Sequence, residues 1–438
     1  MTNMKVKIIG AGLAGSEAAW QLASQRIQVR LYEMRPNKMT PAHDTEMLSE
    51  LVCSNSLKAD RLDNASGLLK GEMRKLNSLI IESADRHKVP AGGALAVDRD
   101  GFSAYITKKI QEHPNIQLVR EEVTEIDGNS QEPIIIATGP LSSSAISDSI
   151  AKLIEQDYLY FYDAAAPILT YESLDLDKVY RASRYGKGDD DYINCPMTKE
   201  EYLAFYNELI CAEEAPVHDF EDSKVFEGCI PIEVMARRGE DTMRFGPLKP
   251  VGLIDPKTEK EAYAVVQLRQ DDASGNLFNL VGFQTHLKFG EQKRVFSMIP
   301  GLESAEFIRY GVMHRNTYIH SPKLLDQYYR LKTNPNILFA GQITGVEGYV
   351  ESASSGLLAA YNLARMLKGK ESVDFTNQTI IGALAHYVSQ TPSKDFQPMN
   401  ANFGIIAPLE KRIRNKKERN MVLANRSLDT IDSLLSSE

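Results

Sequence analysis

The stretch KVKIIGAGLAGSEAAW, residues 5–20, decides the fold of this chain. Its apolar start predicts a β-strand, its glycine-rich centre a tight turn, and its alanine-rich end a helix. Gly10, Gly12 and Gly15 have the G-x-G-x-x-G spacing, in which the first permits the turn, the second lets backbone approach a pyrophosphate, and the third lets the helix pack on the strand. The stretch therefore predicts a dinucleotide-binding unit with phosphate at the helix N-terminus.

An acidic residue follows at the expected distance. A second apolar run, residues 27–31, leads to Glu33, which lies 18 positions after Gly15. An acid at this place accepts hydrogen bonds from ribose hydroxyls and repels a 2′-phosphate. The spacing favours a bound dinucleotide over a purely structural glycine turn, and it leaves FAD and NAD both open.

The opening pattern returns late in the chain. Residues 336–352, NILFAGQITGVEGYVES, predict a buried strand, a glycine-rich turn and the start of a helix that ends near Leu367. NAD needs only one such unit, whereas extended FAD commonly uses two, so the repeat favours FAD. The predicted cofactor-binding residues are Gly10, Ala11, Gly12, Leu13, Ala14, Gly15, Glu33, Gly341, Gln342, Gly348, Tyr349 and Glu351.

Between these units the pattern changes. Aromatic residues, prolines and short strand-like runs replace the alternation of strand and helix from about residue 160 to 330. We therefore expect an α/β protein: a discontinuous, doubly wound, FAD-binding Rossmann-like domain at 1–160 and 331–438, and an inserted mixed α+β substrate domain at 161–330. Its candidate surface motifs are residues 226–233, 267–272, 282–286 and 311–317.

Composition limits the remaining possibilities. The chain has 438 residues, of which 25% are charged, and no apolar run long enough to span a bilayer, so we expect no membrane segment and a cytoplasmic protein. Four scattered cysteines without a C-x-x-C pair argue against a structural zinc site, a dithiol redox motif and a plain disulfide reductase. The net charge of −9 makes any polyanion binding depend on a local basic patch.

One such patch lies near the C-terminus. Six basic residues fall within nine positions: Lys411, Arg412, Arg414, Lys416, Lys417 and Arg419. The run is typical of a solvated helix face, and it also suits contacts to nucleic-acid phosphates.

Five motifs together resemble a known family. They are residues 10–19 (GAGLAGSEAA), 51–56 (LVCSNS), 90–99 (PAGGALAVDR), 227–229 (EGC) and 345–352 (GVEGYVES). The chain resembles the folate- and FAD-dependent tRNA uracil-5-methyltransferases from end to end. That family is similar to larger flavoproteins that install carboxymethylaminomethyl groups on wobble uridines, and this chain's lack of a further helical domain favours the shorter methyltransferase.

The resemblance implies an activity. Methylenetetrahydrofolate would supply a one-carbon unit, FAD would mediate its transfer and reduction, NADPH or NADH would supply electrons, and uridine 54 in the T loop of tRNA would become 5-methyluridine. The sequence leaves the oligomeric state open. The alternatives are a flavin-dependent modifier of another tRNA uridine that acts with a partner protein, and a tRNA-binding flavoprotein that assists folding.

Two cysteines are the catalytic candidates on this resemblance. Uracil C5 becomes nucleophilic once a thiolate adds at C6. We expect Cys229, in a turn before a predicted strand, to attack C6, and Cys53 to handle the C5 proton or guard the flavin adduct. Cys195 and Cys211 are expected to be structural.

Other side chains are candidates for contacts in the site. Tyr349, Arg99 and His286 are candidates for stacking or polar contacts. Arg237, Arg238 and the basic tail are candidates for tRNA phosphate contacts. For His286 and His314 we favour a structural role, and neither is counted as catalytic.

Overall fold

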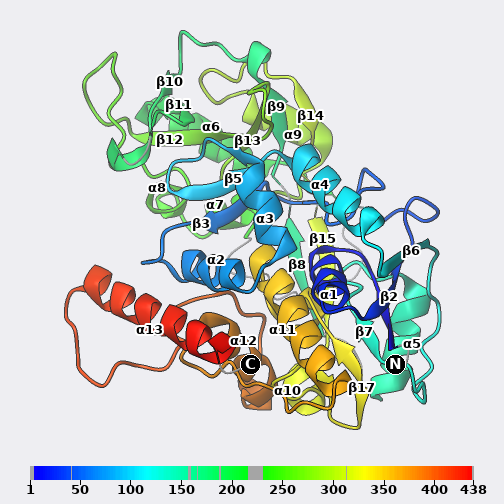
Figure 1. Cartoon of the computed structure of the whole chain (residues 1–438). Coiled ribbons are helices and arrows are strands. Elements are labelled where there is room, and N and C mark those ends of the chain that lie inside the picture. The colour runs from blue at the N-terminus through cyan, green and yellow to red at the C-terminus, as the bar shows by residue number, and fades with distance from the viewer. Residues whose placement is uncertain are drawn as a thin grey trace.

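The first strand lies in the middle of a six-stranded sheet (Figure 1). The computed structural model describes residues 4–40, 42–155, 159–164, 166–186, 189–215, 230–311 and 313–436. The strand order is β16 (Arg330–Leu331), β17 (Asn334–Phe339), β7 (Ile134–Ile136), β1 (Lys5–Ile9), β2 (Gln28–Glu33) and β6 (Ile116–Arg120). All pairs are parallel except the edge pair β16–β17. The late strand β17 thus joins the N-terminal strands in one doubly wound sheet, which confirms the predicted fold class.

Helices α1 (Leu13–Ser24) and α11 (Tyr349–Leu367) cross in direct backbone contact. A Cβ placed on Gly356 of α11 would lie 2.1 Å from the carbonyl oxygen of Ala14 in α1. Glycine at this position therefore lets the two strand-turn-helix units approach each other, although they come from opposite ends of the chain.

We expect Gly356→Ala to destabilise the fold by about 2–3 kcal/mol, because an added methyl group would force two packed helices apart. The measurement is the urea midpoint of unfolding. Gly93→Ala is the matched control, because a Cβ there meets no atom within 4 Å. Equal midpoints for the two variants would contradict the proposed packing.

A small antiparallel sheet lies beside the large one. Its order is β3 (Ser56–Ala59), β5 (Ala94–Val97) and β4 (Lys88–Val89), and the helices nearby are α2 (Ala65–Lys75), α3 (Leu79–Arg86) and α4 (Arg99–Glu112). Helix α5 (Ser144–Ile154) lies on the other side of the large sheet's domain, next to β7 (Figure 1). α2 and α3 are separate helices, because Asn77 adopts φ +54° and Ser78 caps α3.

The middle of the chain forms a second sheet with its own core. The strand order is β10 (Tyr180–Arg181), β11 (Tyr192–Met197), β12 (Ala264–Gln270), β13 (Leu277–Leu280), β9 (Ile168–Thr170) and β14 (Phe307–Arg309). Its helices are α6 (Lys199–Cys211), α7 (Ile232–Arg237), α8 (Thr242–Phe245) and α9 (Phe289–Phe296). The strands β8 (Leu159–Ala164) and β15 (Met313–Tyr318) pair antiparallel where the chain leaves and re-enters the larger sheet's domain.

The two large hydrophobic cores place residues 318–329 with the large sheet, whereas we expected the inserted domain to extend to residue 330. One core draws on residues 6–154 and 318–431, and the other on residues 169–307. Tyr318, Leu325 and Tyr329, which the sequence suggested were part of the inserted domain, pack in the larger core. Residues 318–329, just before β16, are rich in aromatic residues like the inserted domain, but their apolar side chains pack in the larger core.

Two C-terminal helices, α12 (Ile380–Gln390) and α13 (Lys416–Ser436), are bound to α2 of the larger domain through a buried carboxylate. The short helix α10 (Ser321–Leu324) packs against α12. Glu72 accepts hydrogen bonds from the N–H groups of Ile380 and Ile381 and from the Ser427 hydroxyl, and burial raises the pKa of Glu72 to about 7. Within the described ranges, no helix combines the length and apolarity needed to cross a bilayer.

Candidate functional site

A cavity open to solvent lies at the carboxyl ends of the parallel strands, and its space, together with the solvent at its mouth, is about 1070 Å³. Five segments line it: the β1–α1 turn, the end of β2 with the loop after it, the stretch after β6, the end of β7 with the start of α5, and the β17–α11 turn. Ligands of doubly wound folds bind at this edge, where strand order reverses. The cavity therefore has the place that the two glycine-rich units predict.

The N-terminus of α1 opens into this cavity without a side-chain cap. Gly12 is its N-cap residue, no side chain accepts from the first turn, and that turn carries no acid. A Cβ on Gly12 would meet no protein atom within 4 Å, so the space beside it is empty of protein. Uncapped N–H groups beside an open space suit a phosphate group.

Glu33 is fixed beside the same turn. Its carboxylate accepts from the Ala11 N–H at 3.2 Å, and Arg35 donates to it from its backbone N–H at 3.1 Å and from Nε at 3.0 Å. Burial by itself would raise the pKa of Glu33, but Arg35 and these hydrogen bonds outweigh it and lower the pKa. Glu33 is therefore ionised at neutral pH, and both of its oxygens accept hydrogen bonds beside the turn.

Cys53 and Tyr349 meet at the side of the cavity. The Tyr349 hydroxyl accepts from the N–H groups of Cys53 at 2.8 Å and Ser54 at 3.3 Å, and it lies 2.9 Å from Cys53 Sγ. Burial raises the pKa of Tyr349 well above its usual range, so it keeps its proton. Because its lone pairs already accept two N–H groups, the hydroxyl proton is free to point at sulfur and stabilise a thiolate.

Arg99 adds positive charge next to this pair. Its guanidinium donates to the Leu51 carbonyl and, from Nε at 2.9 Å, to Asp271 of the inserted domain. Burial by itself would lower the pKa of Arg99, but Asp271, Tyr349 and Cys53 outweigh burial and raise it. A thiol next to a fixed cation and a hydroxyl donor is in an environment typical of reactive cysteines.

Most of the predicted cofactor residues lie together. Nine of them line the cavity: Gly10, Ala11, Gly12, Leu13, Ala14, Glu33, Gly341, Gln342 and Tyr349. Gly15, Gly348 and Glu351 do not. Gly15 packs on the turn, where a Cβ would lie 1.9 Å from the Gly10 carbonyl oxygen, and Glu351 turns to Lys58 at 3.2 Å and to the Ala401 N–H at 3.0 Å.

The other candidate side chains lie elsewhere. His286 contacts Glu233 through Nδ1 at 2.6 Å and Glu214 through Nε2. Glu214 also pairs with Arg237. Cys195 is buried in the inserted domain's core, and Cys211 is exposed on α6. Cys229 and the side chain of His314 lie outside the described residues. The strand predicted after Cys229 is wrong: Ile232–Arg237 is the helix α7, with Pro231 as its N-cap.

Sequence reasoning also missed several residues. Arg35, Thr40, His43 and Glu50 line the cavity from the loop after β2, and none of the four was among the predicted site residues. The motif at 267–272 was expected at the surface, but Arg269, Gln270 and Asp271 are buried. Their polar groups bond across the boundary between the two domains, a contact that no local pattern encodes.

Comparison with known proteins bears on this site. The family model described as "Glucose inhibited division protein A" matches residues 5–371. A Ligilactobacillus salivarius protein named "Methylenetetrahydrofolate--tRNA-(uracil-5-)-methyltransferase TrmFO" is 61% identical over 426 residues, 97% of each chain. A Bacillus licheniformis protein of the same name is 61% identical over 432 residues, 99% of each chain.

A solved structure has the same fold. Aquifex aeolicus GidA aligns with a TM-score of 0.68 and 16% identity, and the match covers 100% of this chain and 76% of that one. At this identity the likeness establishes the architecture alone.

Proposed function

Because the chain belongs to the TrmFO family of methylenetetrahydrofolate--tRNA-(uracil-5-)-methyltransferases, we propose that it methylates C5 of uridine 54 in the T loop of tRNA, using FAD and a nicotinamide reductant. The observation that carries the proposal is the cavity between the two glycine-rich units, with Cys53 held at its side by Tyr349. The cavity supplies a dinucleotide site and Cys53 supplies a reactive group next to it.

FAD fits the cavity through residues from both ends of the chain. The α1 N-terminus and Gly12 would hold the pyrophosphate, Glu33 a ribose, and the Gly341–Gln342 turn the far half of the molecule. When bound, the flavin supplies hydride and one-carbon transfer chemistry that protein side chains lack. NADPH or NADH is proposed as the source of its electrons.

The thiol chemistry follows from uracil itself. A thiolate that adds at C6 makes C5 nucleophilic, so C5 can bond to the one-carbon unit of methylenetetrahydrofolate as the bond of that unit to the folate nitrogen breaks. A hydride from the proposed nicotinamide reductant, passed on by the flavin, would finally convert the methylene unit to methyl. The C5 proton must then leave before the C6–S bond can break. We propose Cys53 as the base that takes this proton, with Tyr349 and Arg99 stabilising its thiolate, and Cys229 as the group that adds at C6.

The experiment is direct. The purified protein with FAD, NADPH and methylenetetrahydrofolate is incubated with tRNA transcribed without modifications, and the nucleosides are analysed by mass spectrometry. 5-Methyluridine at position 54 is expected. A product at another uridine, or tRNA binding without any product, would contradict the proposal and favour a different tRNA modifier or a folding role.

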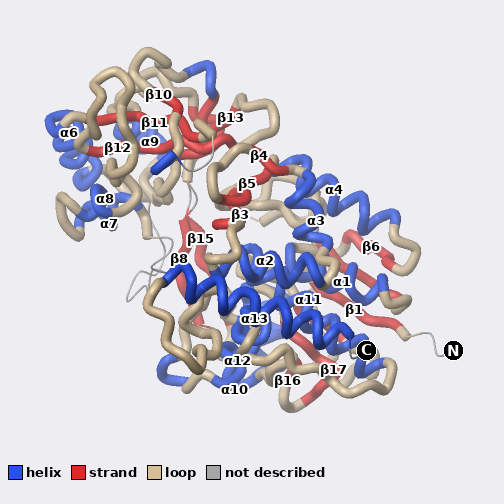
Figure 2. Tube along the Cα trace, turned by 60° about the vertical axis from the view of Figure 1, so that its left-hand side comes forward, coloured by secondary structure: helices blue, strands red, loops and turns tan. Residues whose placement is uncertain are grey.

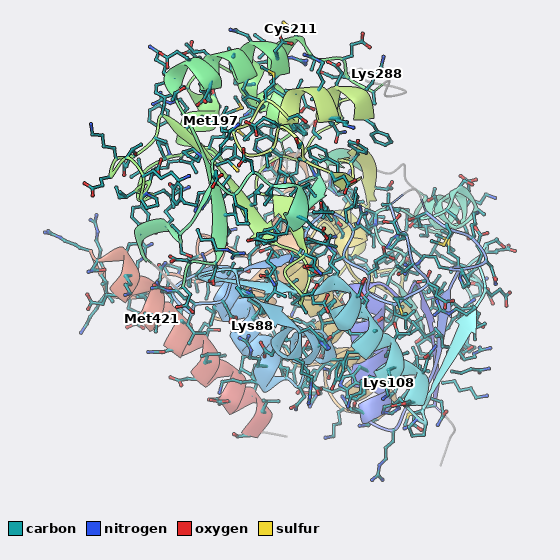
Figure 3. All side chains as sticks on the ribbon, turned by 90° about the horizontal axis from the view of Figure 1, so that it is seen from above. Lys88, Lys108, Met197, Cys211, Lys288 and Met421 are labelled. Carbon is teal, nitrogen blue, oxygen red and sulfur yellow. The ribbon has the colours of Figure 1, made fainter. Side chains whose placement is uncertain are left out.

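The basic C-terminal run is proposed to contact tRNA phosphates. All six cations of residues 411–419 are exposed, and none forms an ion pair with a carboxylate in the part of the chain that the structure describes. Lys416, Lys417 and Arg419 stand in the first turn of α13, where the helix dipole disfavours cations. An anionic partner would remove this conflict. Figure 3 shows α13, marked by Met421, at the edge of the molecule with side chains extending into solvent.

We expect Lys416→Ala with Lys417→Ala to raise the KM for tRNA about tenfold without lowering kcat. The slope of log kcat/KM against log salt concentration should become shallower by about 2, because two phosphate contacts are lost. Lys108→Ala with Lys288→Ala, at two exposed lysines elsewhere (Figure 3), is the control. An unchanged salt slope would show that α13 is a solvated face.

A further inference from the structure

The Cys53 loop is held by the inserted domain. Figure 2 shows β3 to β5 between the inserted domain and the large sheet. The loop that carries Cys53 immediately precedes β3, and the end of β12 meets it there. The contacts come from three consecutive residues, Arg269, Gln270 and Asp271, all buried.

Arg269 makes the central contact. Its Nη2 donates to Ser54 Oγ at 2.8 Å and its Nε donates to Asn55 Oδ1 at 3.0 Å. These acceptors are the two residues that follow Cys53. Arg269 therefore bonds the inserted domain to the loop one and two residues from the thiol.

The position of Arg269 is unfavourable for a side chain with only a packing role. It is 8% exposed, and burial together with nearby Arg99 lowers its pKa by more than Tyr192 and Asp271 raise it. Within the described ranges Asp271 pairs with Arg99, and Arg269 forms no ion pair with a carboxylate. A buried guanidinium without a carboxylate costs free energy that an apolar side chain of similar length avoids. The charge is therefore explained best by the hydrogen bonds that it makes to the loop.

Neighbouring contacts complete the hold. Asn55 is fully buried and donates from Nδ2 to the Gln270 carbonyl at 2.9 Å and to the Val97 carbonyl at 3.0 Å. On the other side of Cys53, Arg99 joins the Leu51 carbonyl to Asp271. The loop is thus fixed on both sides of the thiol, and residues 269–271 of the inserted domain take part on each side.

We infer that Arg269 is a positioning residue for Cys53, which it holds in place beside the cavity-lining Val52 and Tyr349 through its bonds to Ser54 and Asn55. The inference rests on the proposed role of Cys53. It makes the docked inserted domain a requirement for the thiol's orientation, so that the two domains act as one catalytic unit.

The test compares Arg269→Met, Arg269→Lys and the control Arg294→Met, at an exposed arginine of the same domain that pairs with Glu208 and Glu291. We expect Arg269→Met to change the rate of Cys53 alkylation by iodoacetamide, followed by peptide mass spectrometry, at least about fivefold. Its kcat should fall about 10² while the KM for tRNA stays within about twofold, because a misaimed group loses rate rather than binding. Arg269→Lys should restore part of the alkylation rate and part of kcat, and Arg294→Met should change neither the alkylation rate nor kcat.

Arg269→Met with wild-type alkylation and kcat would overturn the inference. If Arg269→Met fails to fold, Ser54→Ala tests the inference instead, because it removes the 2.8 Å bond from Arg269 and leaves the buried charge in place. Ser54→Ala should change the rate of Cys53 alkylation as Arg269→Met does. A wild-type alkylation rate in Ser54→Ala would overturn the inference. Alkylation needs no tRNA or folate. An inactive wild-type enzyme would therefore refute the proposed function while the alkylation rates still test the role of Arg269.

Discussion

Cys53→Ala is expected to lower the rate of tRNA methylation at least about 10³-fold, while flavin content and tRNA binding stay unchanged. The thiol is the only group of Cys53 that the substitution removes, and the backbone N–H that donates to Tyr349 remains. Without the base, the C5 proton stays on the methylated intermediate and the bond from Cys229 to C6 cannot break. A covalent complex of protein and tRNA should therefore accumulate and be visible on a denaturing gel.

The control is Cys211→Ala, at an exposed cysteine on α6. It should methylate at the wild-type rate. Full activity of Cys53→Ala would remove Cys53 from the mechanism. Loss of activity without a covalent complex would reverse the two roles, because Cys53 would then be the group that adds at C6.

The sequence was enough for the parts of the fold that local pattern determines. The strand, turn and helix at residues 5–20 depend on neighbours a few positions apart, and the structure has β1 and α1 there. The late helix begins at Tyr349 and ends at Leu367, as the run of small and apolar residues predicts. Hydrophobic periodicity and glycine spacing act over short distances, so one sequence is sufficient to recognise them.

The contacts that complete the site were beyond such patterns. Cys53 and Tyr349 are 296 positions apart, and each was a candidate alone, but no spacing rule predicts that a hydroxyl would lie 2.9 Å from the thiol. Arg269 was part of a candidate surface motif, residues 267–272. It is buried because Ser54 and Asn55 of another domain satisfy its donors, and only the folded chain brings them together.

Gly12→Val should produce a folded protein that lacks flavin. The N-cap has φ −70° and ψ −168°, an extended conformation that valine adopts, and a Cβ there meets no protein atom. The added side chain would occupy the space beside the uncapped N–H groups, where the pyrophosphate is proposed to lie. FAD affinity is expected to fall at least about tenfold, which corresponds to about 1.4 kcal/mol or more. The visible flavin spectrum and the thermal unfolding curve of the purified protein measure the two effects separately.

Two other glycines make this prediction specific. Gly93→Val places the same side chain at a position that is equally open but outside the cavity, so it should keep both fold and flavin. Gly15→Val belongs to the same motif, but its Cβ would lie 1.9 Å from the Gly10 carbonyl oxygen, so it should fail to fold. A yellow, fully loaded Gly12→Val protein would mean that the cofactor does not approach this turn. Since the space beside Gly12 is not needed by the fold, loss of colour with retained stability can be explained only by a ligand that occupies it.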